Sequence, residues 1–176
     1  MKKNILILIM LILSNIAFSQ YSKEITTGLF VNFPVNPIYK VQGNSLMYNT
    51  KTENCFFMTL IQTNSIPNYE KFVLAEKKWS NVEKKKFRDT FLDNVVIGKL
   101  NYTGNNGEVT EIKIGNYYGR KISYNAINPA TGDRGNRYSI ILSIRDQLIS
   151  IECWYLVDNS NSEKEKNNFF NSIKIN

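Results

Sequence analysis

The chain has 176 residues, with 22 Lys and Arg against 15 Asp and Glu, which gives a formal net charge of +7. It contains no histidine. This absence excludes the usual general base near neutral pH, histidine-activated serine or cysteine nucleophiles, and the commonest protein ligand of zinc and copper. The length suits one domain.

The N-terminal segment predicts a secretory signal. Two lysines precede an unbroken apolar run over 5–13, and Ala17 and Ser19 fit a signal-peptidase site. The run is shorter than the roughly 20 apolar residues of a membrane span. We therefore expect a signal peptide over 1–19, cleavage before Gln20, and an exported protein, periplasmic or secreted, with no transmembrane span after cleavage. The Asn-, Lys- and Ile-rich composition is typical of bacteria.

A short N-terminal segment over 20–27 and a single domain over 28–176 are expected after the signal. The first half of that domain predicts strands. "GLFVNFP" stops at a proline, and "IYKVQ" and "SLMYN" flank a Gly-Asn turn. "NCFFMTLIQ", over 54–62, is apolar on both faces. A strand of this kind is expected to be covered on both sides.

The middle of the chain predicts two helices, or one bent helix, with a break near Ser80. Aromatic and apolar residues share one helix face from Tyr69 to Trp79. Ser80 and Glu83 fit a capping box, which marks the start of a helix. Gly98 is the expected stop.

The second half predicts strands again, followed by a helix. "VTEIKI", "RKISYNAI", "RYSIILSI" and "LISIECWYLV" are the expected strands, and the last two are close enough to form a hairpin. Ser162 and Glu165 fit a second capping box before the C-terminal helix. The order of elements predicts an α+β domain, in which helices cover an antiparallel β-sheet as in an α/β/α sandwich.

Four stretches resemble the PsbP/DcrB-like fold family of small exported domains. They are "LFVNFP", "IKIGNYYGRKISY" with Gly115 and Gly119, "RYSIILSI" and "FFNSIKI". In this order they resemble the opening strand, the central hairpin, the next core strand and the closing helix with its tail. The resemblance covers about residues 28–175. It implies an antiparallel sheet sandwiched between helices and a protein that binds or supports other proteins, without a shared catalytic or metal site.

Cys55 and Cys153 both lie in predicted strands. Alternation places Cys153 on the same face as Ile149 and Ile151, which is the expected core face. Two alternatives stay open: a disulfide, favoured by an oxidising compartment, or two separate buried thiols. A catalytic cysteine is disfavoured because no histidine is present to activate it.

The charged residues do not predict a catalytic, metal or cofactor site. Glu108 and Glu111 are three residues apart in a predicted strand and therefore point to opposite faces. A basic run in the predicted helices is interrupted by acidic residues, which indicates a solvated face, or contact with an anionic envelope surface, rather than nucleic-acid binding. Its members are Lys77, Lys78, Lys84, Lys85, Lys86 and Arg88.

Two connections between strands form the candidate binding surface. The polar loop over 128–136 carries charged groups and glycines, and a tight turn precedes it with adjacent tyrosines. Loops carry binding residues more often than strands do, and Tyr and Arg are frequent at binding hot spots. The candidate residues are Tyr117, Tyr118, Asp133, Arg134 and Arg137.

The leading hypothesis is an exported, non-enzymatic domain that binds or supports another cell-envelope protein. The alternative is a periplasmic protein that binds a small ligand in a pocket between the sheet and a helix layer, with converging polar groups. An enzyme that uses Lys, Tyr or carboxylate chemistry is the third hypothesis, and it requires a cleft with a strongly perturbed ionisable group.

Overall fold

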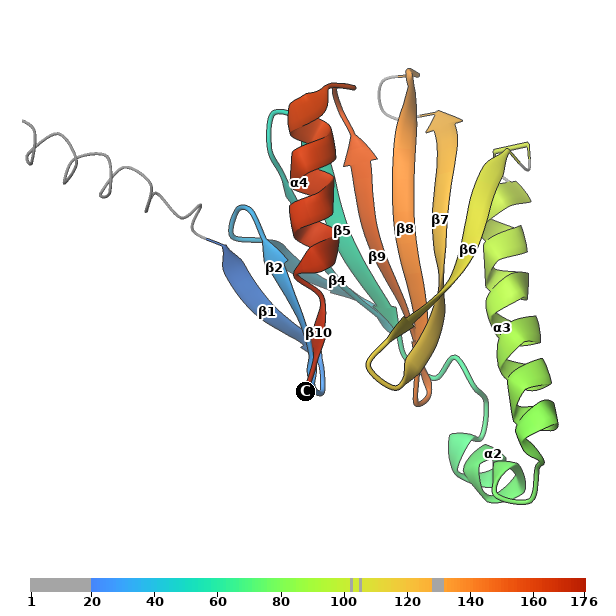
Figure 1. The fold of residues 1–176 in the computed structure, drawn as a ribbon. Helices are drawn as coiled ribbons and strands as arrows, with labels where there is room; N and C mark the ends of the chain where they lie inside the picture. Colours follow the sequence, from blue (N-terminus) through green and yellow to red (C-terminus); the bar gives the residue numbers. More distant parts are fainter. Residues whose placement is uncertain (1–19, 102, 105, 128–131) are drawn as a thin grey trace, which may run out of the picture.

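The computed structural model describes residues 20–101, 103–104, 106–127 and 132–176. Within them, a seven-stranded antiparallel sheet has the strand order β3-β4-β5-β9-β8-β7-β6, and a three-stranded sheet has the order β1-β2-β10 (Figure 1). The predicted α+β class is confirmed. The strands are β1 Tyr21–Thr26, β2 Leu29–Phe33, β3 Ile38–Gln42, β4 Ser45–Lys51, β5 Cys55–Gln62, β6 Gly107–Ile114, β7 Tyr117–Ile127, β8 Arg134–Ile144, β9 Gln147–Tyr155 and β10 Lys174–Ile175. The helices are α2 Tyr69–Glu76, α3 Asn81–Asn101 and α4 Ser160–Asn171.

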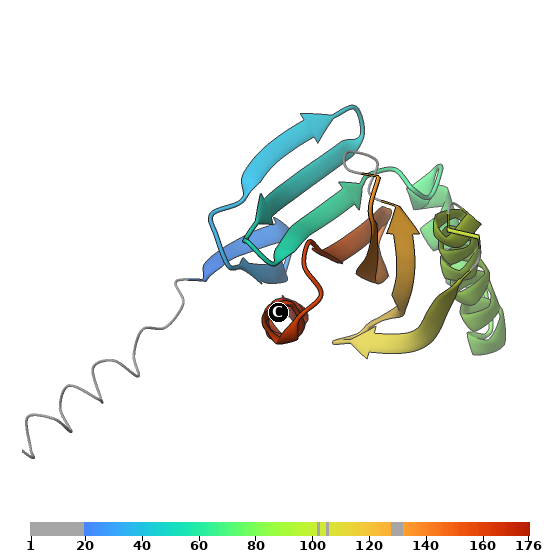
Figure 2. The same cartoon turned by 90° about the horizontal axis from the view of Figure 1, so that it is seen from above.

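The large sheet curls around α4, which lies inside the curve with the small sheet beside it (Figure 2). The main core fills this space. Phe57 on β5, Phe33 on β2 and Phe169 on α4 are fully or almost fully buried, and Phe169 contacts both other rings with centroids 4.9 and 5.4 Å apart. The expected strand "RYSIILSI" is β8, and it alternates: Ile140, Leu142 and Ile144 belong to this core, and Tyr138 packs against it.

Helix α3 covers the other face of the large sheet, over β7 and β8. Leu92, Val96 and Leu100 of α3 form a second core with residues of these strands, including Ile122 and Ile141. A polar link adds to it. Buried Arg120 on β7 donates to Asp93 at 2.8 Å and to Asp89 at 3.3 Å, and both acceptors belong to α3.

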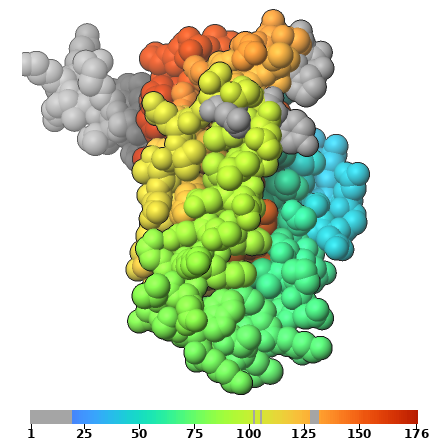
Figure 3. Space-filling view, turned by 90° about the vertical axis from the view of Figure 1, so that its right-hand side faces the viewer, coloured from blue at the N-terminus to red at the C-terminus, as the bar shows by residue number. Residues whose placement is uncertain are grey.

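The expectation that β5 is covered on both faces is met on one face only. Cys55, Phe57 and Ile61 are fully buried, whereas Phe56, Met58 and Leu60 are half-buried. The reason is that α3 lies mainly over β7 and β8 and does not extend over β5. In the space-filling view a little of the orange-red C-terminal part shows between green α3 and the teal strands (Figure 3).

The predicted helix break at Ser80 is confirmed, and so is its capping box. The Ser80 N–H donates to the Glu83 carboxylate at 2.7 Å, and the Glu83 N–H donates back to the Ser80 hydroxyl. The expected stop at Gly98 is wrong, because α3 continues to Asn101. None of the described helices combines the length and the apolar character needed to cross a membrane.

The second predicted capping box is also wrong. Asn159 caps α4, and its side chain accepts a hydrogen bond from the Ser162 N–H at 2.9 Å. Glu165 lies past the first turn and reaches the β4–β5 turn instead, where it accepts from Thr52 and Asn54. A Ser-x-x-Glu spacing therefore cannot by itself locate the start of a helix. The same spacing also occurs between two residues within a helix, as it does here.

The small sheet includes residues of the short N-terminal segment over 20–27, because β1 lies within that segment. Strand β1 pairs with β2 along its length and buries Ile25 in the main core. Strand β10 pairs with the other side of β2. The first and last described strands thus lie on either side of β2.

Candidate functional site

The five candidate binding residues fall into two groups at opposite ends of β7. Tyr117 and Tyr118 begin this strand beside the β6–β7 turn, whereas Arg134 pairs with Ile127 at the other end. Nine residues of extended strand separate the two ends by about 30 Å. The structure therefore does not bring these residues together in one surface, and their role in binding stays a prediction.

The two tyrosines differ in how accessible they are. Tyr117 packs against the main core. The Tyr118 ring lies beside two cations, with the Arg88 guanidinium 3.8 Å and the Lys113 ammonium 5.2 Å from its centroid. Arg88 belongs to the predicted basic run. These contacts hold the ring against α3 and β6 and reduce the surface it can offer to a partner.

Arg137 also makes contacts within the domain. Its guanidinium lies 4.0 Å from the Trp154 ring centroid and donates to the Ile127 carbonyl at 2.8 Å. Asp133 and Arg134 border the loop, of which 128–131 lie outside the described residues.

Cys55 and Cys153 are fully buried, and both are free thiols. The strand register explains why the disulfide alternative is not the arrangement found. Cys153 lies opposite Phe57, and Cys55 lies opposite Tyr155, so the two cysteines are diagonal neighbours rather than a direct pair. Cα atoms in a diagonal pair are about 7–8 Å apart, which is at or beyond the span of a disulfide. A hydrogen bond with Cys55, and then burial, raise the pKa of Cys153 far above its ordinary value.

A buried carboxylate lies on the face of the sheet covered by α3. Glu152 of β9 accepts hydrogen bonds from Lys99 of α3 at 2.5 Å, from Ser150 at 2.7 Å and from Trp154 at 2.8 Å. Burial by itself would raise the pKa of Glu152, but the charge of Lys99 and these hydrogen bonds together lower it. Because its contacts join α3 to β9 and its partners are all supplied by the fold, we interpret Glu152 as a structural residue.

Strand β3 is one of the two edges of the large sheet (light blue in Figure 2), and β6 is the other. Its three large apolar side chains are largely in solvent: Ile38 is 61% exposed, Tyr39 50% and Val41 59%. Only β4 pairs with it, so the backbone groups on its outer side have no partner strand in the described residues. Natural edge strands usually carry charges or bulges that prevent further pairing, and Lys40 is the single charged residue here.

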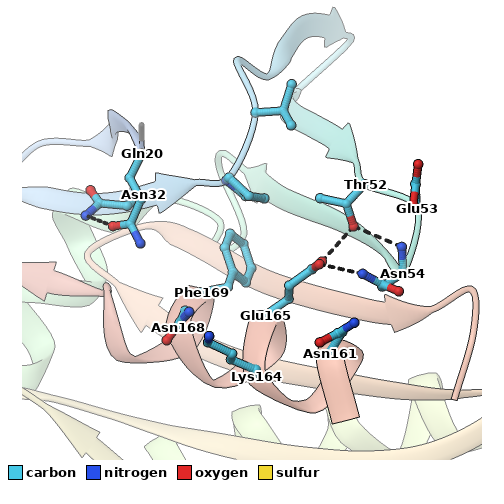
Figure 4. A pocket seen from close by; sticks show the side chains of 12 residues that line it. Gln20, Asn32, Thr52, Glu53, Asn54, Asn161, Lys164, Glu165, Asn168 and Phe169 are labelled. Atoms are coloured by element: carbon cyan, nitrogen blue, oxygen red, sulfur yellow. Dashed lines mark hydrogen bonds between the residues drawn. The ribbon is translucent and has the colours of Figure 1, made fainter. Parts of the chain in front are cut away.

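A cavity of about 430 Å³ lies between α4, the end of β2 and the β4–β5 turn. Figure 4 shows Phe169 at its back and the polar side chains of Glu165, Thr52 and Asn54 along one wall. Thr52 donates to Glu165 at 2.6 Å and Asn54 donates at 2.7 Å, so both carboxylate oxygens are held in place.

Another polar cluster fixes α4, which forms one wall of this cavity. Tyr155 donates to Glu163 at 2.6 Å, and the Lys166 ammonium lies 2.7 Å from the same carboxylate oxygen. Hydrogen bonds from Lys166 and then Tyr155 lower the pKa of Glu163 to about 2. This link joins α4 to β9, so the cavity wall is attached to the centre of the large sheet.

Sequence reasoning missed both the β3 edge and the cavity. For β3 a signal was available, because "IYKVQ" has apolar residues on both faces of a short strand with no compensating charge pattern. For the cavity no such signal existed. Its residues come from separate elements that only the fold brings together.

No protein-family model matches the sequence, and no curated protein matches it. The solved structures that match this fold include the following two. One is the solution structure of cyanobacterial PsbP (CyanoP) from Synechocystis sp. PCC 6803, with a TM-score of 0.52 and 11% identity over 90% of this chain and 94% of that one. The other is a crystal structure from Bacteroides thetaiotaomicron, with a TM-score of 0.48 and 9% identity over 89% of this chain; the match spans 49% of that longer chain.

At this level of identity the similarity to cyanobacterial PsbP concerns the fold alone. It extends over nearly the whole of both chains, and it agrees with the large antiparallel sheet between α3 and α4. The protein has a PsbP-like α+β fold.

Proposed function

We propose that the protein is an exported, non-enzymatic domain that binds another protein of the cell envelope through its β3 edge. The observation that carries this proposal is the exposure of Ile38, Tyr39 and Val41 on a strand whose outer side has no partner among the residues that the structure describes. An extended segment of a partner would add a strand there, with main-chain hydrogen bonds giving affinity and the apolar side chains giving specificity.

The charge of the edge favours a partner segment with an acidic residue at its centre. Lys40 is the middle residue of β3, and Lys51 lies at the end of neighbouring β4. A second copy of this chain, paired antiparallel along the full strand, would place Lys40 opposite Lys40. Directly opposed like charges destabilise strand pairing, so the proposed partner is a different protein.

Site-specific photocrosslinking in intact bacteria that export the protein tests this proposal. A photoreactive phenylalanine analogue replaces Tyr39, and the matched control carries it at Val82, an apolar residue of α3 that is 77% exposed. We expect a discrete adduct from position 39 that is absent from position 82, and a weaker adduct when Lys40→Glu is added. Equal adducts at both positions, or none at 39, would show that β3 is not the binding edge.

A further inference from the structure

The cavity beside α4 has the features of a ligand site that is separate from the β3 edge. Its volume of about 430 Å³ lies within the range of about 300–1,000 Å³ found for small-molecule sites. We propose that it binds a neutral saccharide, a mono- or disaccharide or the end of a longer glycan. This deepens the ligand-binding alternative and does not depend on the proposed partner of β3.

The first support is the number of side-chain amides around the cavity. An amide presents both donors and acceptors, and a sugar hydroxyl also donates and accepts, so the two groups complement each other in either direction. The carboxylate of Glu165 adds acceptors on the same wall. The lining amides are Gln20, Asn32, Asn54, Asn161 and Asn168.

Several of these polar groups are not used by the fold. Among the described residues, the side chains of Asn161, Asn168 and Lys164 make no hydrogen bond, and all three extend from α4 along the rim in Figure 4. Asn32 donates to Gln20 at 3.0 Å, which leaves the acceptor of Asn32 and the donors of Gln20 available. Hydrogen-bonding capacity therefore remains for a ligand.

The second support is an apolar surface within the same cavity. Phe169 forms its back (Figure 4), and Pro34 and Val35 also line it, with Val35 44% exposed. A pyranose ring combines an apolar C–H face with a rim of hydroxyl groups, so it can use both kinds of lining. A wholly apolar ligand would instead desolvate the amides without replacing their hydrogen bonds to water, which is unfavourable.

The charges of the lining select against anionic ligands. The lining contains two carboxylates, those of Glu53 and Glu165, and one ammonium group, that of Lys164. The local charge is therefore negative, and a phosphate or a uronic acid would be repelled. Glu165 is held by Thr52 and Asn54, so this negative charge has a fixed position.

Nuclear magnetic resonance titration of the folded chain tests the assignment. The probes are glucose, N-acetylglucosamine, cellobiose and chitobiose at millimolar concentration, with glucuronate and glucose 6-phosphate as charged counterparts. We expect at least one neutral sugar to shift the side-chain amides of Asn54, Asn161 and Asn168, with the anionic sugars at least tenfold weaker. Shifts from an anionic sugar alone, or no saturable shift from any neutral probe, would overturn the proposal.

A matched pair of variants controls for non-specific effects. Val35→Trp enlarges a partly exposed side chain that lines the cavity, while Val82→Trp adds the same side chain to an exposed site on α3. Binding is expected to fall at least tenfold in the first variant and to stay unchanged in the second. Equal affinity in both would place the sugar elsewhere. The photocrosslinking experiment at β3 does not depend on the sugar titrations. Partner binding at β3 and sugar binding in the cavity are therefore tested separately.

Discussion

Gly119 lies where two strands leave no room for a side chain. A β-carbon built on this residue would be 2.3 Å from the Ile141 carbonyl oxygen and 2.6 Å from a methyl group of Leu142. The backbone of β8 cannot move away without breaking its pairing with β7. Gly119 is one of the two glycines in the predicted central hairpin, and the structure supplies a steric reason for it.

We predict that Gly119→Ala lowers the free energy of unfolding by about 2 kcal/mol, because overpacking forces a backbone shift. The matched control is Gly98→Ala in α3, where a β-carbon meets nothing within 4 Å. That change is expected to raise stability by about 0.5–1 kcal/mol, since Gly is a poor helix residue. Urea denaturation of the two variants and the wild type measures both effects. A neutral Gly119→Ala would contradict the packing described here.

The two buried thiols lead to a second prediction at this scale. In the folded protein neither cysteine is expected to react with iodoacetamide, because both are fully buried and the pKa of Cys153 is raised. In denaturant without reductant, mass spectrometry is expected to find two alkylated cysteines. If the protein isolated from its cells gains labels only after reduction, Cys55 and Cys153 form a disulfide in the cell, and the free thiols describe the reduced form.

At the scale of elements, α3 is joined to β9 by the Lys99–Glu152 ion pair. We predict that Lys99→Met lowers the free energy of unfolding by about 3 kcal/mol at pH 7, because it leaves the buried carboxylate without its cation. In the wild type the pKa of Glu152 is below its ordinary value of 4.5. The ion pair therefore contributes its stability above that pH and loses it as the pH falls further.

The loss of unfolding free energy caused by Lys99→Met is thus expected to be smaller when unfolding is measured below pH 4.5. A double variant, Lys99→Met with Glu152→Met, provides the control, because it removes the buried charge together with its partner. It is expected to recover much of the lost stability at pH 7. A penalty that is the same at both pH values would mean that the lost packing of the lysine, not the unpaired carboxylate, causes the destabilisation.

Sequence patterns predicted the elements well where the local signal was unambiguous. Ser80 and Glu83 follow a break in the apolar phase, and they do cap α3. Ser162 and Glu165 have the same spacing but lie inside α4, because Asn159 provides the cap. Gly98 did not stop α3, since packing of Leu100 beyond it outweighs the small cost of one helical glycine.

At the scale of the molecule, the helical pair extends beyond the sheet that supports it (Figure 1). Helix α2 has no buried residue, and its aromatic rings contact the start of α3, as in the Phe72–Phe87 pair at 4.9 Å. The buried residues of α3 all lie in its second half. The first half of α3 therefore contacts the sheet through polar groups, as in the Arg88–Tyr118 and Asp89–Arg120 contacts, rather than through buried apolar residues.

We predict that this region opens without unfolding the sheet. Amide hydrogen exchange is expected to be fast in α2 and in the first turns of α3, and limited by global unfolding in β5, β8 and β9, because regions with few buried apolar contacts open locally. Hydrogen exchange measured at increasing denaturant concentrations separates local opening from global unfolding. Equal protection in α2 and β9 would show that the helical pair and the sheet form one cooperative unit.

The candidate sites were the least predictable part of the molecule. The tyrosines and arginines chosen from the sequence are suitable residue types for binding, but they lie toward opposite ends of the paired strands β7 and β8. The cavity depends on contacts such as Thr52 with Glu165, which are 113 residues apart. No spacing rule within one element reveals such a pair, because the curl of the sheet and the position of α4 create it.

The position of β2 between the first and last strands also determines when the fold can be completed. The Asn32 N–H donates to the Ser172 hydroxyl across 140 residues, and β10 pairs with β2 over a similar separation. Contacts between such distant parts of a chain form slowly during folding. Helix α4 follows every strand of the large sheet in the chain, so during synthesis the wall that it forms is made after that sheet. Only a chain that already includes α4 can therefore possess the cavity, and one synthesised as far as β9 exposes the aromatic core that α4 later covers.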